Sequence, residues 1–158
     1  MLKRLFSLLI LTSLMLVLPV HATPLLQAVA ANDLAAVQNI LQNPAQAGLL
    51  EVRDELGRTP LLLATDHNRI AIARALIAAG ANVNAKDSRQ DSPYLLAGAQ
   101  GRLEILKMTL AHGADLGSTN RYGGTALIPA AERGHVAVVR TLIAVSYTHL
   151  TLPTTERV

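Results

Sequence analysis

The sequence predicts an all-α solenoid of stacked helix–turn–helix units, and three observations support this prediction. The same pattern returns every 33 residues in segments that begin at Asp54, Asp87 and Asn120. Each segment contains two short runs of apolar residues at helical spacing. The segments are joined by polar, turn-rich connectors that suit a hairpin-like loop better than a helix. One such unit cannot bury its own apolar face, so we expect neighbouring units to stack into a continuous core.

Residues 1–22 precede the repeats and have the three-part organisation of a secretory signal peptide. Lys3 and Arg4 form a basic start, and an apolar run follows from Leu5 to Leu18. Val20 and Ala22 fit positions −3 and −1 of a cleavage site. The apolar run is shorter than the roughly 20 residues that a membrane-spanning helix needs. We therefore expect cleavage after Ala22, with an uncleaved membrane anchor as the alternative.

Cysteine content and charge exclude several classes of protein. The chain has no cysteine, which excludes disulfides, thiolate metal sites and a lipid-bearing cysteine at the cleavage point. Its formal net charge falls from +3 to +1 when Lys3 and Arg4 leave with the signal peptide. No basic cluster remains, so charge gives no argument for nucleic-acid binding. The expected location is the bacterial periplasm or the outside of the cell.

Residues 23–52 form a degenerate leading unit. The stretch "TPLLQAVAANDLAAVQNILQNP" contains two apolar helical runs separated by an Asn-Asp turn. The offset from Thr23 to Thr59 is 36 residues rather than 33, which places a three-residue insertion near Pro44 to Leu50. An atypical terminal unit is typical of a capping repeat. Its start directly after Ala22 agrees with cleavage at that point.

The later units carry start and stop signals for both of their helices. Thr59 and Ser92 each precede a proline, which suits a helix N-cap followed by proline at the first helical position. A residue that tolerates positive φ separates the two helices, and a glycine ends the second helix. These residues are Asn68, Gly101 and Gly134 at the turns, and Gly80 and Gly113 at the helix ends.

The repeated lines resemble ankyrin repeats, whose pattern is roughly D-x-x-G-x-T-P-L-H-x-A-A-x-x-G-H, an apolar helix and G-A-D/N-x-N. The first line matches at Asp54, Gly57, Thr59, Pro60, Leu61, Ala64 and Gly80 to Asn84; the second at Asp87, Pro93, Ala97, Gly101 and Gly113 to Asp115; the third at Gly123, Thr125, Leu127, Ala130, Ala131, Gly134 and His135. The resemblance implies a capping repeat at 23–52, repeats at 53–85 and 86–118, and an incomplete repeat at 119–144. Leu62, Leu95 and Ile128 replace the family's usual histidine. That histidine commonly ties adjacent loops together, so its loss implies a somewhat looser stack.

No motif for catalysis or cofactor binding is present. The chain lacks a cysteine nucleophile, a glycine-rich phosphate loop, HExxH and GxSxG. Asp66 and His67 are the one acid–imidazole pair after the signal peptide, but adjacent helical residues point in different directions. His135 occupies the family's Gly-His turn, where a structural role is usual. We expect no enzymatic activity, no metal and no cofactor; an enzyme that uses His67 is a third alternative behind two binding functions.

The resemblance implies that a partner binds along a concave ridge made of connector tips and the exposed ends of the first helices. Positions on this ridge do not follow the repeat, so they are free to specify a partner. The candidate residues are Glu55, Leu56, Arg58, Asp66, His67, Ser88, Arg89, Asp91, Gln100, Arg121, Tyr122, Glu132 and Arg133. Tyr122 is the strongest candidate because tyrosine is enriched at binding hot spots, whereas leucine is not. The alternative is that an exposed Leu56 or Tyr122 has no binding role.

The implied function is that of a non-catalytic protein–protein interaction module in the bacterial periplasm. Its partner would be an envelope or exported protein of unknown identity, and no nucleic acid is expected. A membrane would be involved only through the signal peptide before cleavage. The alternative is a secreted, host-directed ankyrin effector.

The C-terminal residues depart from the repeat. The last unit stays in register through Ala144, after which the expected glycine and connector are missing. From Val145 to Thr154 the chain resembles, codon by codon, the conceptual translation of a transposase-based sequencing adapter. We therefore expect residues 145–158 to be a non-native, disordered tail, the last helix to fray near Ala144, and the solenoid to be truncated. The alternative is a native tail that folds back onto the last repeat as a cap.

Overall fold

The structure is a computed structural model that describes residues 23–150, with the side chains of residues 44–47 and 147–150 left out. The predicted signal peptide at 1–22 and residues 151–158 of the predicted tail lie outside the described residues.

Every regular element between residues 23 and 150 is helical, as predicted. Four helix pairs follow one another along the chain, and a 3-10 helix, η1, stands in the segment where the sequence predicts an insertion. The elements are α1 (Pro24–Ala30), α2 (Leu34–Leu41), η1 (Pro44–Glu51), α3 (Pro60–Asp66), α4 (Ile70–Ala78), α5 (Pro93–Gln100), α6 (Leu103–Ala111), α7 (Leu127–Glu132) and α8 (Val136–Leu150).

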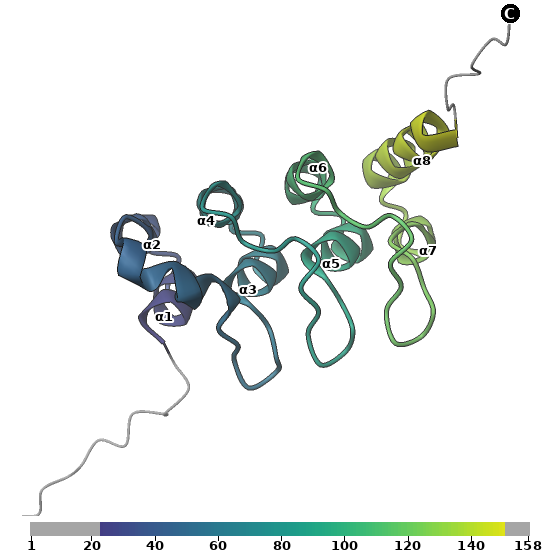
Figure 1. The fold of residues 1–158 in the computed structure, drawn as a ribbon. Helices are drawn as coiled ribbons and strands as arrows, with labels where there is room; N and C mark the ends of the chain where they lie inside the picture. The colour runs from purple at the N-terminus through teal and green to yellow at the C-terminus, as the bar shows by residue number, and fades with distance from the viewer. Residues whose placement is uncertain (1–22, 151–158) are drawn as a thin grey trace, which may run out of the picture.

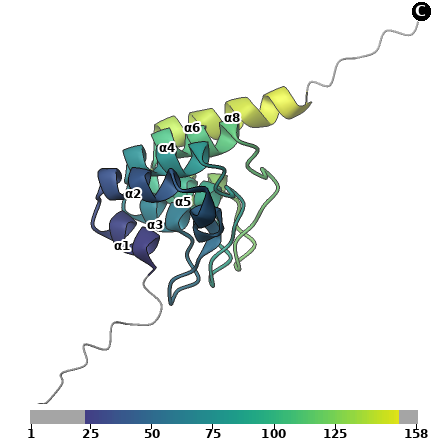
Figure 2. The ribbon, with the colours of Figure 1, turned by 60° about the vertical axis from the view of Figure 1, so that its left-hand side comes forward.

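The helix pairs stack side by side into a solenoid (Figure 1). The first helices α1, α3, α5 and α7 form an inner row, and the second helices α2, α4, α6 and α8 form an outer row. Three connector loops project from the inner row and lie next to one another, as the turned view in Figure 2 also shows. Each helix pair packs mainly against the pairs before and after it. Because of this arrangement, the connectors and the inner helices together can form one binding surface.

The core lies between the two rows and continues from one repeat to the next. Leu61, Leu76 and Ile105 are fully buried, and the apolar cluster to which they belong extends from α1 to α8. Small residues allow the inner helices to approach closely: a Cβ atom added to Gly98 in α5 would lie 2.7 Å from the Cβ atom of Ala126, just before α7. A small residue at position 98 is therefore a packing requirement of the stack.

The predicted helix signals are confirmed in the two complete repeats. The hydroxyls of Thr59 and Ser92 accept hydrogen bonds from the backbone amides of Leu62 and Leu95, both at 3.3 Å. The predicted turn residues and terminal glycines all have positive φ. In the last repeat, α7 begins at Leu127, and its N-cap residue, Ala126, has no side chain able to cap. Its first helix is shorter and lacks the side-chain cap that the two complete repeats have.

The expected end of the last helix near Ala144 is wrong. Helix α8 continues to Leu150, and the Ser146 hydroxyl donates to the carbonyl oxygen of Leu142 at 2.9 Å within it. The physical reason is the missing stop signal: residue 146, which aligns with Gly80 and Gly113, is a serine that can continue a helix. The expectation of disorder is thus wrong for residues 145–150.

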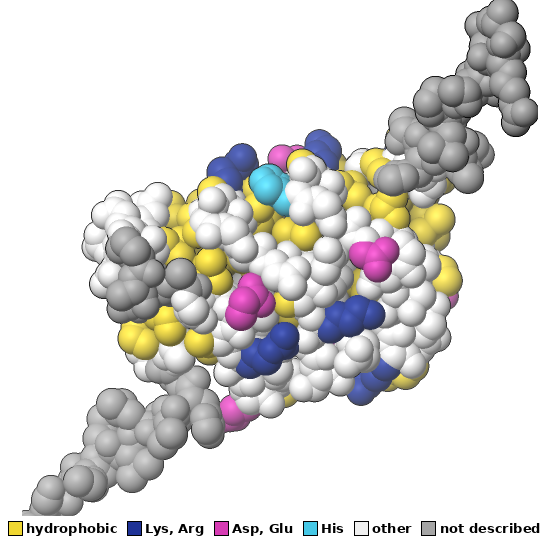
Figure 3. All heavy atoms as spheres, viewed as in Figure 1, with side chains coloured by type: hydrophobic (Ala, Val, Ile, Leu, Met, Phe, Trp, Pro, Cys, Tyr) yellow, Lys and Arg dark blue, Asp and Glu magenta, His cyan; other side chains and the backbone are white. Residues whose placement is uncertain are grey.

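The last repeat has an uncovered apolar end. Leu127, Ile128, Val136 and Ile143 are exposed, and Figure 3 shows hydrophobic side chains gathered at the end of the molecule near α8. Elsewhere on that view, positive and negative side chains are scattered rather than grouped by sign. Between residues 23 and 150, no helix combines the length and hydropathy needed to cross a membrane.

Candidate functional site

The three connectors are built around one repeated side-chain oxygen. Asp54 Oδ1 accepts hydrogen bonds from the backbone amides two and four residues later, at 2.9 and 2.8 Å. Asp87 Oδ1 and Asn120 Oδ1 make the same pair of bonds at distances from 2.8 to 3.1 Å. These Asx-type turns fix the connector tips in the same conformation in all three repeats.

Each tip also needs one residue with positive φ. Gly57 and Gly123 occupy this position with φ of 75° and 74°, whereas Gln90 occupies it in the middle connector with φ of 64°. A residue with a side chain is strained in this region. Sequence reasoning missed Gln90, although the glycines 33 residues before and after it were a visible signal.

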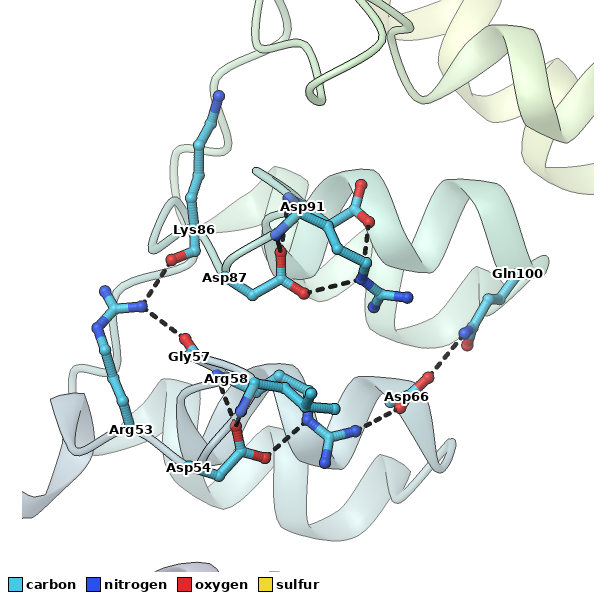
Figure 4. Close-up of polar contacts among 11 residues, drawn as sticks. Arg53, Asp54, Gly57, Arg58, Asp66, Lys86, Asp87, Asp91 and Gln100 are labelled. Carbon is cyan, nitrogen blue, oxygen red and sulfur yellow. Dashed lines mark hydrogen bonds and ion pairs between the residues drawn. The ribbon is translucent and has the colours of Figure 1, made fainter. Parts of the chain in front are cut away.

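Hydrogen bonds between repeats hold the tips side by side. The backbone amide of Ser88 donates to the carbonyl oxygen of Leu56 at 3.2 Å, and the amide of Arg121 donates to that of Arg89 at 3.3 Å. A cation at the base of the first and second connectors adds a second link. The Arg53 guanidinium donates to the Lys86 carbonyl oxygen at 2.6 Å (Figure 4), and the Lys86 ammonium donates to a carbonyl 33 residues further on at 2.8 Å.

Three of the candidate residues form a polar network between the first two complete repeats. Arg58 donates to Asp54 and to Asp66, both at 2.7 Å, and Gln100 Nε2 donates to the other oxygen of Asp66 at 2.8 Å (Figure 4). Burial alone would raise the pKa of Asp66, but the Gln100 hydrogen bond and the Arg58 charge outweigh it and lower the pKa. Arg58, Asp66 and Gln100 therefore connect repeats, and their polar groups are largely used within the protein.

A second polar group lies in the middle connector. Arg89 Nε lies 3.3 Å from an oxygen of the buried Asp87 and 3.7 Å from one of Asp91. Burial and the nearby Asp87 carboxylate raise the pKa of Asp91, and Arg89 and Arg121 reduce this effect. The charges of Arg89 and Asp91 are thus partly satisfied by each other.

A groove of about 610 Å³ lies beside these groups, bounded by the middle and third connectors and by α5 and α7. Seven of the thirteen candidate residues line it. They are Arg89, Asp91, Gln100, Arg121, Tyr122, Glu132 and Arg133. Its remaining walls include Leu96, Ala99, Asn120 and Pro129, which the sequence-based list did not contain.

The side of the groove formed by the third connector and α7 holds polar groups that the described protein leaves largely free. The Arg121 guanidinium carbon lies 4.9 Å from the centre of the Tyr122 ring, and 79% of Tyr122 is exposed. Arg133 uses one guanidinium nitrogen to bond the Ala99 carbonyl oxygen. Within residues 23–150, the side chains of Arg121 and Glu132 make no hydrogen bond or ion pair.

The other candidate residues lie on the first two connectors and at the end of α3. Glu55, Leu56, His67 and Ser88 are exposed, but none of them lines the groove. The structure therefore does not gather all thirteen candidates at one place. It divides them into a network between repeats, a groove and a set of separate exposed positions.

The part of the chain that the structure describes contains no group of three or more potential metal ligands. The groove joins guanidinium groups, carboxylates and an aromatic ring. Such a surface can bind a partner by hydrogen bonding, charge and apolar contact.

Comparison with known proteins finds ankyrin-repeat relatives along most of the described chain. A family model described as "Ankyrin repeats (3 copies)" matches residues 4–87, and one described as "Ankyrin repeats (many copies)" matches residues 94–143. The first match includes part of the predicted signal peptide. The ankyrin repeat protein YahD of Escherichia coli (strain K12) is 34% identical over 91 residues, which are 58% of this chain and 45% of YahD.

Two solved structures are also similar. An ankyrin repeat domain from Acinetobacter baumannii AYE has 63% sequence identity and a TM-score of 0.72. The ankyrin repeat protein EF0377 has 48% identity and the same TM-score. Each match covers 77% of this chain and 60% of the solved chain. The chain thus spans less than half of YahD and 60% of either solved relative.

Proposed function

Because the chain belongs to the ankyrin-repeat family, whose repeats generally serve as protein–protein interaction modules, we propose that it binds another protein through the groove beside α5 and α7. The single observation that carries this proposal is the gathering of seven of the thirteen candidate residues around one groove. The family's fold is typically non-catalytic, and the proposed role is likewise binding rather than catalysis.

The proposed place of action is the bacterial periplasm, with an envelope or exported protein as partner. The support for this location is the signal-peptide organisation of residues 1–22. Expression with the protein's own leader tests it. N-terminal sequencing of the periplasmic product is expected to begin at Thr23, and accumulation only in the cytoplasm would contradict the proposal. Accumulation only in the medium or in host cells would favour the effector alternative.

Affinity capture from periplasmic extract tests the binding role. We compare the wild type with a double variant, Arg121→Ala and Tyr122→Ala, and with a control, Arg74→Ala, on the exposed surface of α4. A specific partner is expected with the wild type and the control and is expected to be lost with the double variant. Equal capture by all three proteins would show that the groove is not the binding site.

A further inference from the structure

The groove has an excess of positive charge and an exposed aromatic ring, which together indicate the chemistry of its partner. We infer that it binds a short segment in which an acidic side chain lies beside an apolar one. This inference rests on the proposed function, because it names the kind of partner that the same groove would take.

Two arginines on different walls supply the positive groups. Arg121 belongs to the third connector, and Arg133 follows α7 as its C-cap residue. The Arg121 guanidinium makes no hydrogen bond within the described residues, although its charge acts on Asp91, and Arg133 uses one nitrogen to reach Ala99. A guanidinium presents a fixed fork of donors that fits a carboxylate with two parallel hydrogen bonds. A carboxylate in the groove could thus be contacted from either wall.

The acidic groups of the groove do not cancel its preference for a carboxylate on the partner. Three arginines and two carboxylates line it, which gives a formal excess of one positive charge. Asp91 lies 3.7 Å from Arg89, so its charge is partly offset within the protein. Glu132 is the other carboxylate, and it disfavours a densely charged partner such as a nucleic-acid backbone. One carboxylate on the partner suits this balance better than a run of them.

Tyr122 supplies the apolar contact. Its ring is 79% exposed and lies against the Arg121 guanidinium at 4.9 Å. An exposed aromatic side chain offers a large rigid contact area with little conformational freedom to lose. Since the ring and the guanidinium are adjacent, a partner that uses both must carry its acidic and apolar groups close together. The groove's volume of about 610 Å³ suits a few side chains, hence a short segment rather than a whole domain.

Selection from a random peptide library displayed on phage tests this inference with a defined probe. The full chain, expressed with its own leader, is the target, and Arg121→Glu, Tyr122→Ala and Arg74→Glu are compared with it. Wild type and Arg74→Glu are expected to enrich peptides that pair Asp or Glu with an aromatic or aliphatic residue. Arg121→Glu and Tyr122→Ala are each expected to weaken those peptides by about tenfold or more. Thermal unfolding of each variant shows whether the fold is kept.

The outcomes separate this inference from the proposed function. Enriched peptides that are basic or uncharged, yet are weakened by Tyr122→Ala, would overturn the inference and leave the groove as the binding site. Peptides that bind all variants equally, or a selection that gives no peptide sensitive to Tyr122→Ala, would overturn both. Weaker binding at higher salt is expected for the wild type, and binding that does not change with salt would also overturn the inference.

Discussion

The repeat at 53–85 and the last, incomplete repeat at 119–144 follow the same pattern but differ in what covers them. Leu62 is fully buried in the first of these, whereas Ile128, at the same repeat position, is 51% exposed. Leu61 and Leu127 differ in the same way. At these two positions, an apolar residue on an inner helix is thus buried where another repeat follows it and exposed in the last described repeat. The sequence pattern alone does not distinguish the two cases.

The polar residues show a parallel difference. In the first complete repeats, Arg58, Asp66 and Gln100 bind one another across the repeat boundary. In the last repeat, Arg121 and Glu132 have no such partner within the described residues. Asp66 therefore serves stability through a residue of the following repeat, whereas Glu132, at the same position of the last repeat, has no ion pair among the described residues.

The largest expected difference in stability is between Leu62→Ala and Ile128→Ala, which truncate apolar side chains at the same repeat position. Leu62→Ala is expected to lower the free energy of unfolding by about 3 kcal/mol because it leaves a cavity in the core. Ile128→Ala is expected to change it by less than about 0.5 kcal/mol because the side chain is already exposed. Urea unfolding followed by circular dichroism measures both. Equal losses would mean that the apolar end is covered in solution, and sedimentation would show whether a second copy covers it.

A smaller effect is expected where inner helices approach each other. Gly98→Ala is expected to destabilise the protein by about 1–3 kcal/mol, because the new Cβ atom would lie 2.7 Å from the Cβ atom of Ala126 and 3.2 Å from its carbonyl oxygen. Helix propensity alone would favour alanine by about 1 kcal/mol. The control is Ala131→Gly, at the same repeat position in the uncovered α7, where only the propensity loss is expected. A gain in stability from Gly98→Ala would show that the repeats are looser than the structure indicates.

Removing the charge of Asp66 and removing the charge of Asp91 are expected to change the stability of the fold in opposite directions. The pKa of Asp66 is below its ordinary value of 3.8, so its ionised form stabilises the fold above that pH, and this contribution is lost as pH falls through the lower folded pKa. Asp66→Asn is therefore expected to destabilise the protein at pH 7, by about 1 kcal/mol for a partly exposed pair.

Asp91 has a raised pKa, so its ionised form is less favourable in the folded protein than in the unfolded one. Asp91→Asn is expected to stabilise the protein slightly at pH 7, and this difference should vanish as pH falls through the raised pKa and then below 3.8. Urea midpoints of both variants at pH 7 and pH 3 give the comparison. Changes of the same sign at pH 7 would contradict it.

A similarly small effect is expected at the connector tips. Gln90→Gly is expected to stabilise the protein by roughly 0.5–1 kcal/mol, because glycine removes the strain of a positive φ. Gly123→Ala, at the same position of the next connector and with no atom near the new Cβ, is expected to destabilise it by about 1 kcal/mol. Thermal unfolding of the two variants checks both signs. A loss of stability with Gln90→Gly would show that its side chain makes a contact in solution.

Most of the fold could be predicted from the sequence because its signals are local and recur. The caps at Thr59 and Ser92 and the turn at Asn68 depend on neighbouring residues in the chain. The end of α8 could not be placed from the sequence. The missing glycine removes a stop signal, but it does not show how far the helix continues.

The candidate site was predicted less completely, because it depends on contacts between repeats. From the sequence, Arg58 and Asp66 are expected to be binding residues on the ridge. Their use in a network with Gln100 follows only from how closely the repeats stack. The sequence also predicts Arg121 and Tyr122 as binding residues, and both line the groove.

The most direct test of the account compares two connector tips at the same repeat position. Leu56 and Tyr122 are both exposed, but only Tyr122 lines the groove. The measurement is the affinity of the captured partner for Leu56→Ala and Tyr122→Ala by titration calorimetry. The account predicts at least a tenfold loss with Tyr122→Ala and less than a twofold change with Leu56→Ala. Equal losses, or a larger loss with Leu56→Ala, would contradict a binding site centred on the groove.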